Sequence, residues 1–372
     1  MRRACYIFAS LIPIAVVIIA VSLGFIKAPG ARATASAAVC TPTGFMRDGI
    51  DLTAAVIDPV GTYSGTLDAT GCNIGIYYSS GITAAVNNAE IFGANYFGIV
   101  NNGGNVTISN SRIHDIGESP FNGDQHGVGI YFADGSSAKG SITSNSVYRY
   151  QKGGIVVNGV GSSATIKHNS VLGLGPVNFI AQNGIEVGDG AQASVINNAV
   201  TGNSYTGSEG VSSGGILVFG GSCYASALTV KTSISKNILI GNDVGVFLSN
   251  LDVDPNNPNN CLPTTTATKI TTSQNTIRND SVNNTSGFGS PGSGYQAGVS
   301  DQGDFDQISA NKICGKGYTP VPTPPPYLYR IDVTATNHAI VHSNTSCSKG
   351  DSTSSQAQTT TLRSEKQAAV FR

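Results

Sequence analysis

The sequence lacks tryptophan and has few charged residues. Charged side chains make up 12% of the 372 residues, against roughly 25% in an ordinary soluble domain. Because 21 Lys and Arg nearly balance 22 Asp and Glu, the net charge gives no reason to expect nucleic acid as a partner. The chain also lacks a nucleotide-binding glycine loop, a Ser-His-Asp nucleophile motif and a zinc motif. Glycine, with 46 residues, is abundant together with Ser, Thr and Asn, which is typical of a turn-rich β protein.

Two short signals alternate along most of the chain. In one, a β-branched residue is followed three positions later by asparagine, as in Ile166 and Asn169. In the other, glycine is followed by Ile or Val and an alternating strand, as in Gly184–Val187. Self-similarity of this kind indicates a solenoid. The asparagines in phase are Asn88, Asn110, Asn145, Asn169, Asn198, Asn237, Asn275, Asn311 and Asn344.

The alternation along each strand predicts which side chains are buried. Ile185 and Val187 should face the interior, with Glu186 facing outward. Parallel strands stack about 4.8 Å apart, so every coil supplies the next with backbone partners. Buried asparagine amides would bond to one another from coil to coil, which removes the cost of burying them.

These signals resemble those of the right-handed parallel β-helix superfamily, the pectin-lyase-like fold, of bacterial secreted type, over about residues 70–347. The resemblance implies an all-β, single-stranded right-handed parallel β-helix solenoid of about nine coils with an internal Asn ladder and an N-terminal cap. It also implies that the Gly-Ile/Val strand is the first of each coil. In the enzymes of the superfamily this strand forms the floor of the substrate cleft.

The predicted organisation has four parts. Residues 1–37 are expected to be a signal peptide, because Arg2 and Arg3 precede an apolar run and small residues follow it. An uncleaved N-terminal anchor is the alternative, since about 20 apolar residues can span a bilayer. Residues 38–72 are expected to cap the solenoid, 73–347 to form the β-helix, and 348–372 to be disordered. The protein is therefore expected to be secreted.

Six cysteines follow the N-terminal segment, and an even number in an exported chain suggests disulfides. Cys314 and Cys347 each stand three residues after a ladder asparagine, so they should occupy one rung of successive coils. Cys223 and Cys261 both follow a Gly-Ile/Val strand, which leaves Cys40 to pair with Cys72. The alternative, a metal site, lacks a Cys-x-x-Cys spacing.

The outward positions of the Gly-Ile/Val strands are the candidate binding surface. One row is Val100, Tyr131, Val156, Glu186, Leu217, Phe247 and Ser300, and the next is Asn102, Ala133, Asn158, Gly188, Phe219, Ser249 and Gln302. We expect Tyr131, Phe219 and Phe247 to contact sugar faces. Asn102 and Asn158 are expected to bond to sugar hydroxyls.

Carboxylates near these rows are the catalytic candidates. Glu186 is the candidate acid or base, and its alternative is a solvated strand residue. Asp134 and Asp189 share a register two coils apart, roughly 9–10 Å, close to the carboxylate separation of inverting glycosidases. Both also precede glycine, as in ordinary turns.

Two loops supply further candidates. Asp124 and His126 lie in a loop that also contains His114, Asp115 and Glu118, which could be an acid–base cluster or a solvated loop. No cofactor is expected, apart from a weak possibility of Ca²⁺, whose oxygen ligands would be Asp301, Asp304 and Asp306.

The resemblance does not extend to the motifs of known enzymes. Lyases of this fold use an Arg or Lys base, and pectin-hydrolysing relatives carry Asn-x-Asp, Asp-Asp, Gly-His-Gly and Arg-x-Lys, which do not occur here in order. We therefore expect a secreted protein that binds a polysaccharide or cell-surface glycan and could cleave it through Glu186 and Asp189, helped by Asp124 or His126. The alternatives are a non-catalytic structural or adhesive cell-surface protein and, third, a polysaccharide lyase or epimerase. No nucleic acid is expected as partner, and a membrane only if the N-terminal segment is uncleaved.

Overall fold

The computed structural model describes residues 39–133, 135–285, 294–334, 338–347 and 358–360. These residues form β-strands with two short 3-10 helices, η1 (Ser222–Tyr224) and η2 (Lys316–Tyr318). The expected signal peptide, Asp134 and most of the expected tail lie outside the described residues. Over the described part of the chain, no helix has the length and apolar character needed to cross a membrane.

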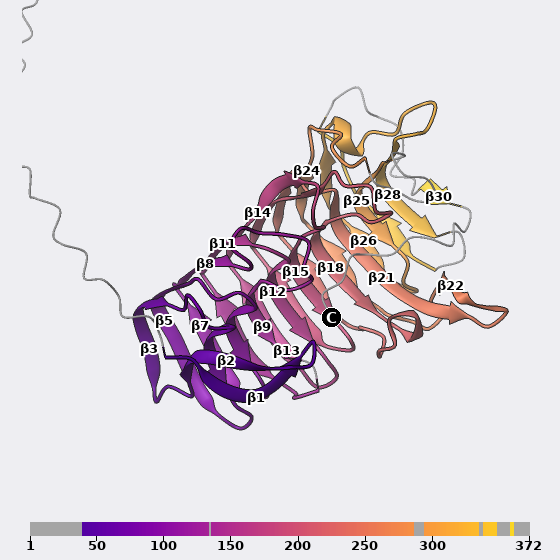
Figure 1. Cartoon of the computed structure of the whole chain (residues 1–372). Coiled ribbons are helices and arrows are strands. Elements are labelled where there is room, and N and C mark those ends of the chain that lie inside the picture. The colour runs from indigo at the N-terminus through magenta and orange to yellow at the C-terminus, as the bar shows by residue number, and fades with distance from the viewer. Residues whose placement is uncertain (1–38, 134, 286–293, 335–337, 348–357, 361–372) are drawn as a thin grey trace, which may run out of the picture. The chain divides into compact units, whose positions relative to one another are not determined.

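The first strands of successive coils stack in parallel into one sheet, here called sheet A (Figure 1). Its strands are β2 (Ile50–Ile57), β4 (Ile74–Tyr78), β6 (Phe97–Asn101), β9 (Val128–Phe132), β12 (Gly153–Asn158), β15 (Asn183–Gly188), β18 (Gly214–Gly220), β21 (Val244–Asp254), β25 (Tyr295–Asp301), β28 (Tyr327–Thr334) and β30 (Gln358–Thr360). β1 (Thr41–Arg47) pairs antiparallel with β2 and forms a hairpin with it.

The other strands of the coils form sheet B. Its second-strand stack contains β7 (Asn105–Ser109), β10 (Lys139–Thr143), β13 (Ser163–Lys167), β16 (Gln192–Ile196), β19 (Ser233–Ser235), β23 (Thr271–Ser273), β26 (Gln307–Ser309) and β29 (Ile340–His342). Its third-strand stack contains β8 (Arg112–Ile116), β11 (Ser146–Tyr150), β14 (Ser170–Val177), β17 (Ala199–Tyr205), β20 (Ile238–Ile240), β24 (Thr276–Arg278) and β27 (Lys312–Cys314). At the N-terminal end β3 (Thr62–Asp68) pairs with β5 (Thr83–Phe92), which pairs with both β7 and β8.

The interior is filled by aligned rows of β-branched residues. Ile130, Ile155, Ile185 and Ile216 occupy one register row of sheet A, and each is fully buried. The prediction that Ile185 and Val187 face inward is confirmed. Aliphatic rows bury a continuous apolar core, which is why each coil is stable only against its neighbours.

A ladder of asparagines runs along the bend between the second and third strands. The backbone N–H and Nδ2 of each ladder residue donate to Oδ1 of the next, as Asn198 does to Asn237 at 2.9 and 3.0 Å. The same pairs of bonds join Asn145, Asn169, Asn198, Asn237, Asn275, Asn311 and Asn344 in turn.

Asn88 and Asn110 are not in this ladder, contrary to the prediction. Both are exposed, with φ of 53° and 50°, and they occupy the left-handed position just before the rung. Ser111 stands on the rung instead, where its backbone N–H donates to Oδ1 of Asn145 at 3.0 Å. The two residues are one position out of register, because asparagine suits the left-handed turn as well as the rung.

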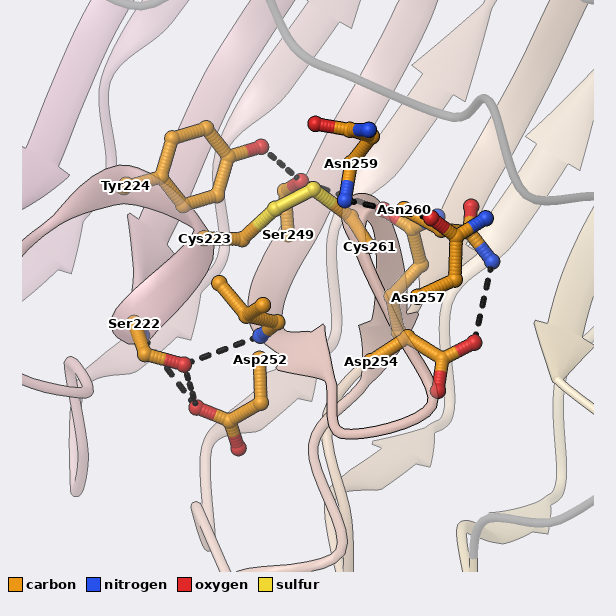
Figure 2. Close-up of a disulfide and its surroundings, with 12 residues drawn as sticks. Ser222, Cys223, Tyr224, Ser249, Asp252, Asp254, Asn257, Asn259, Asn260 and Cys261 are labelled. Atoms are coloured by element: carbon orange, nitrogen blue, oxygen red, sulfur yellow. Dashed lines mark hydrogen bonds between the residues drawn. A yellow bond between two sulfur atoms is a disulfide. The ribbon is translucent and has the colours of Figure 1, made fainter.

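The three disulfide pairings are confirmed. Cys40–Cys72, Cys223–Cys261 and Cys314–Cys347 have Cα–Cα distances of 5.3, 5.8 and 5.3 Å. In Figure 2 the second of these links η1 to the hairpin formed by β21 and β22 (Asn257–Pro263). Bonds of this kind are typical of proteins from an oxidising compartment.

Candidate functional site

Polar side chains line the edge at which the strands of sheet A begin, here called the start margin. In register, the residue before the first paired position is Gly127, Lys152, Gln182, Ser213, Asp243 or Gln296 in successive coils. All except the glycine are polar, and all six are buried. Long insertions enter sheet A at the same edge, so this row is where loops meet the solenoid.

The buried polar residues hold these insertions in place. Oε1 of Gln151 accepts hydrogen bonds from the backbone N–H of Glu118 and of Asn122, both at 3.1 Å. Its Nε2 donates to the carbonyl of Asp124 at 2.7 Å. In a later coil Asp243 accepts from the backbone N–H of Tyr205 at 2.8 Å, among other donors. The insertions are therefore positioned by the core of the solenoid.

The loop held by Gln151 contains the group His126, Glu118 and Asp124. Nε2 of His126 lies 2.8 Å from Oε1 of Glu118, and one ligand atom from each of the three lies within 4.8 Å of the other two. The His126 ring stacks on Tyr96 with centroids 4.0 Å apart. Asp124 is exposed and the Glu118 side chain is 31% exposed, so solvent reaches the group.

Two properties of this group bear on chemistry. A carboxylate beside a histidine fixes the tautomer and the orientation of the imidazole, as a general acid or base requires. Histidine and two carboxylates could also hold a divalent metal ion such as Zn²⁺. The prediction placed Asp124 and His126 together, and the structure brings them together with Glu118.

Lys152 and Glu186 lie farther along the same margin. Both are 1% exposed. Lys152 Nζ donates to the carbonyl of Ala181 at 3.1 Å, and Asn183 Nδ2 donates to Oε2 of Glu186 at 2.8 Å. Burial lowers the pKa of Lys152 to about 8, although the carboxylates of Glu186 and Glu209 oppose the shift. Glu186 is therefore a buried carboxylate whose charge acts on Lys152, and not the solvated strand residue of the alternative interpretation.

The outward face of sheet A is covered over its first coils. Tyr131 is fully buried in an apolar cluster with Phe97 and Val100. Phe45 of β1 packs on this cluster, with its ring centroid 6.4 Å from that of Tyr131, and Arg47 donates a hydrogen bond to the Tyr131 hydroxyl. The expectation that Tyr131 is open to a sugar is wrong, because the hairpin folds over it.

A second cover lies over the later coils. Phe219 and Phe247 are fully buried in a cluster with Tyr224 and Leu251. Figure 2 shows Tyr224 beside the Cys223–Cys261 disulfide, and its hydroxyl lies 2.7 Å from Oγ of Ser249. Phe219 and Phe247 are thus not exposed for sugar stacking either, since the flap of η1, β21 and β22 encloses them.

The remaining predicted residues have different outcomes. Asp189 has φ of 53° in the turn after β15, and it stands three positions after Glu186, about 10 Å along an extended strand. The structure therefore does not pair them. Asn102 is half-buried and donates to the Tyr77 hydroxyl at 2.7 Å. Asn158 is 1% exposed, and its Oδ1 has no hydrogen-bond partner among the described residues.

Three aspartates near the C-terminal end, Asp301, Asp304 and Asp306, are buried, and Asp304 and Asp306 accept hydrogen bonds from different parts of the chain. Asp304 accepts from the backbone N–H and Nδ1 of His338, at 2.8 and 2.9 Å. Asp306 Oδ1 accepts from Thr268 and Ile270, both at 2.6 Å. Burial raises the pKa of Asp301 well above its usual value, and the charge of Asp306 adds to the shift. Among the described residues, the three carboxylates do not gather within 4.8 Å as Glu118, Asp124 and His126 do.

Sequence reasoning missed Lys152 and Gln151. Lys152 stands directly before the strand start Gly153-Gly154-Ile155, and Gln151 stands one residue earlier, at the start margin. The signal that could have found them is a long polar side chain just before the Gly-Ile strand, since the predicted chemistry was placed on the outward strand rows.

The comparisons with known proteins bear on the fold. A family model described as right handed beta helix region matches residues 66–230. No curated protein and no solved structure matches the chain. The parallel coils and this match show that the chain has the fold of a right-handed parallel β-helix.

Proposed function

We propose that this protein is secreted and binds a polysaccharide at the start margin of sheet A, using the loop of residues 117–127. The observation that carries the proposal is the group His126, Glu118 and Asp124, which is partly exposed, preorganised by Gln151 and able to transfer a proton. The three disulfides support an extracellular location.

Cleavage of the bound glycan would use the same group. His126, oriented by Glu118, would donate a proton to the glycosidic oxygen as its bond to the anomeric carbon breaks, while the Asp124 carboxylate forms a bond to that carbon. Water, deprotonated by His126, would then hydrolyse this glycosyl ester and release the sugar. Inverting enzymes hold their two catalytic groups about 6.5–9.5 Å apart to leave room for water. The ligand atoms of His126 and Asp124 lie within 4.8 Å of each other, which favours this double displacement.

The second candidate function is a non-catalytic surface protein. The observation that favours it is the double cover of sheet A, because the hairpin and the flap bury the face where relatives of this fold are expected to bind substrate. The two functions differ in one respect that can be measured, namely whether product appears.

The experiment uses residues 38–372, secreted with the disulfides formed. Binding and release of reducing ends are measured on neutral and acidic polysaccharides, with and without EDTA, for the wild type, His126→Ala and Asp124→Asn. Asp280→Asn is the matched control, because Asp280 is an exposed carboxylate that pairs only with the neighbouring Arg278 among the described residues.

Product that is lost in His126→Ala and Asp124→Asn, but kept in Asp280→Asn, supports cleavage at this group. Loss with EDTA assigns the group to a metal. Binding that depends on His126 without any product supports the surface protein. Equal binding of the neutral polysaccharides by all four proteins, or none by the wild type, contradicts the proposed site.

A further inference from the structure

We propose that the outer face of the second-strand stack of sheet B, from β10 to β26, binds an acidic polysaccharide. The inference goes beyond the proposed function, because it concerns a different sheet, different residues and a charged class of glycan.

The first observation is a separation of charge that the net charge conceals. The strands of sheet B from β10 to β29 are fully described, and they contain no Asp or Glu. In the second-strand stack the basic residues are Lys139 and Lys167, and Lys231 and Lys269 stand just before β19 and β23. Arg149, Arg278 and Lys312 lie in the third-strand stack, where Arg149 pairs with Asp115 and Arg278 with Asp280. The acidic residues of the same coils stand in turns or in sheet A, as Asp189, Glu186 and Asp243 do. A chain with a net charge of −1 therefore presents one face of basic character.

The second observation is a row of lysines at the edge where the second strands begin. In register, Lys139, Ser163 and Gln192 occupy one row. Continuing that register two residues before Ser233 and Thr271 adds Lys231 and Lys269. Lys231 and Lys269 are exposed and stand on adjacent coils, about 5 Å apart in the backbone. Like charges directly opposite each other repel, so an anion bound between them would relieve the repulsion.

The third observation is a regular grid of hydroxyl groups beside these lysines. One outward row contains Thr107, Ser141, Thr165, Ser194, Ser233 and Thr271. The next contains Ser109, Thr143, Lys167, Ile196, Ser235 and Ser273. Hydroxyls thus repeat about every 4.8 Å across coils throughout the first row, and about 7 Å along a strand wherever the second row is not interrupted by Lys167 or Ile196. Such a grid can bond along the length of a polymer that is itself regular.

The face is also hollowed at the lysine row. A hollow of about 260 Å³ is lined by Ser163, Thr165, Gln192, Ser194 and Lys231, among others. Its walls offer hydroxyl and amide groups with one ammonium. Those groups suit a uronate or sulfate group together with its neighbouring sugar hydroxyls.

The same face argues against other polyanions. The outward rows of the second strands from β7 to β26 contain no aromatic side chain, and Phe305, which continues the lysine row in the next coil, is stacked on His338. Single-stranded nucleic acids rely on a succession of aromatic platforms. The large apolar residues of these rows among the described residues are the half-buried Ile196 and Phe305, which is 46% exposed. Two separate side chains do not make the continuous apolar surface that a membrane anchor needs. An acidic polysaccharide needs only cations and hydroxyls.

The test is affinity electrophoresis of residues 38–372 in gels that contain polygalacturonate, with amylose gels as the neutral reference. Lys231→Ala/Lys269→Ala is compared with the control Lys316→Ala, which removes an exposed lysine from η2. Each charge-assisted bond lost should weaken binding about tenfold. We expect the double variant to bind polygalacturonate 10- to 100-fold more weakly and the control to bind as the wild type does. Added salt should weaken wild-type binding.

Three results would overturn the proposal: unchanged binding by the double variant, an equal loss in Lys316→Ala, or equal affinity for amylose. Equal affinity for single-stranded DNA or for phosphatidylserine vesicles would also overturn it, in favour of another polyanion. His126→Ala should retain polygalacturonate binding. That result separates failure at this face from failure at the start margin.

Discussion

His126 is held from two sides, since Nε2 lies 2.8 Å from Oε1 of Glu118 and the ring stacks 4.0 Å from the ring of Tyr96. Glu118 in turn accepts a bond from Asn95 Nδ2 at 3.1 Å, and Asn95 Oδ1 accepts from Asn73 at the same distance. A chain of hydrogen bonds from Asn73 through Asn95 and Glu118 therefore ends at the imidazole of His126. Its orientation is fixed before any ligand binds.

Gln151→Ala should release the loop of residues 117–127. Four hydrogen bonds connect the Gln151 amide to Glu118, Asn122 and Asp124. Their loss from a buried site should lower the free energy of unfolding by about 3 kcal/mol. Chemical denaturation measures the change. Gln125→Ala is the control in the same loop, because Gln125 is exposed and bonds only to the Gly123 carbonyl among the described residues; a similar loss in both variants would contradict the tether.

Asn237→Ala should be more damaging than a change at Asn110. Asn237 accepts from the backbone and side chain of Asn198 and donates to the Val195 carbonyl at 2.9 Å, so its truncation leaves buried groups unpaired and should cost about 3 kcal/mol. Asn110→Gly should cost less than about 0.5 kcal/mol, because φ of 50° suits glycine. Thermal unfolding of both variants measures the two losses of stability. Equal losses would mean that the asparagine ladder does not contribute to the stability of the fold.

The buried carboxylates near the C-terminal end should make stability fall as pH rises. Burial is the main cause that raises the pKa of Asp306 to about 6, and the charge of Asp304 adds to it, while bonds from Thr268 and Ile270 oppose it. The folded state therefore holds a proton that the unfolded chain loses near pH 4. The resulting stability is fully present below pH 4 and is lost as pH rises through 6.

Asp306→Asn should flatten this pH dependence. The amide keeps an oxygen for Thr268 and Ile270 and carries no charge to repel Asp301. At pH 8 we expect the variant to be more stable than the wild type by about 2 kcal/mol, and the two should converge at pH 4. Chemical denaturation at a series of pH values measures the difference in the free energy of unfolding between the two proteins. A variant less stable than the wild type at every pH would contradict the interpretation.

Removing the Cys223–Cys261 bond should loosen the second cover. Ser222 and Asp252 also join η1 to β21, with Ser222 Oγ donating at 3.0 Å (Figure 2), so the flap should stay attached but open more often. We expect Cys223→Ser/Cys261→Ser to lower the free energy of unfolding by about 2–4 kcal/mol. Limited proteolysis should then cut first within residues 250–263. Cleavage that begins elsewhere in the folded protein would show that the disulfide does not hold the flap.

The sequence predicted the coils because their signals are local and repeated. Ile185 and Val187 face inward, and two of the cysteine pairs follow from positions in the repeat, which left Cys40 and Cys72 as the third. Asn110 was misplaced by one residue, since the repeat alone does not distinguish a rung from the left-handed turn before it.

The covers of sheet A could not be read from the repeat. Phe45 contacts Tyr131 although it lies 86 residues earlier in the chain, and the hydrophobic periodicity of the two segments does not predict that contact. The burial of Glu186 depends likewise on long-range packing between coils. The group of His126 and Glu118 was predictable as far as one loop contains both residues, but its orientation by Gln151 comes from the next coil.

The most direct test of the start margin is hydrogen–deuterium exchange on residues 38–372, with and without the polysaccharide that binds best in the panel. The proposed function predicts slower exchange of the backbone amides of residues 117–127 when the glycan is bound, with the effect absent in His126→Ala. Slower exchange only in β10 to β26, or only in the β1–β2 hairpin, would contradict the assignment of the function to this loop.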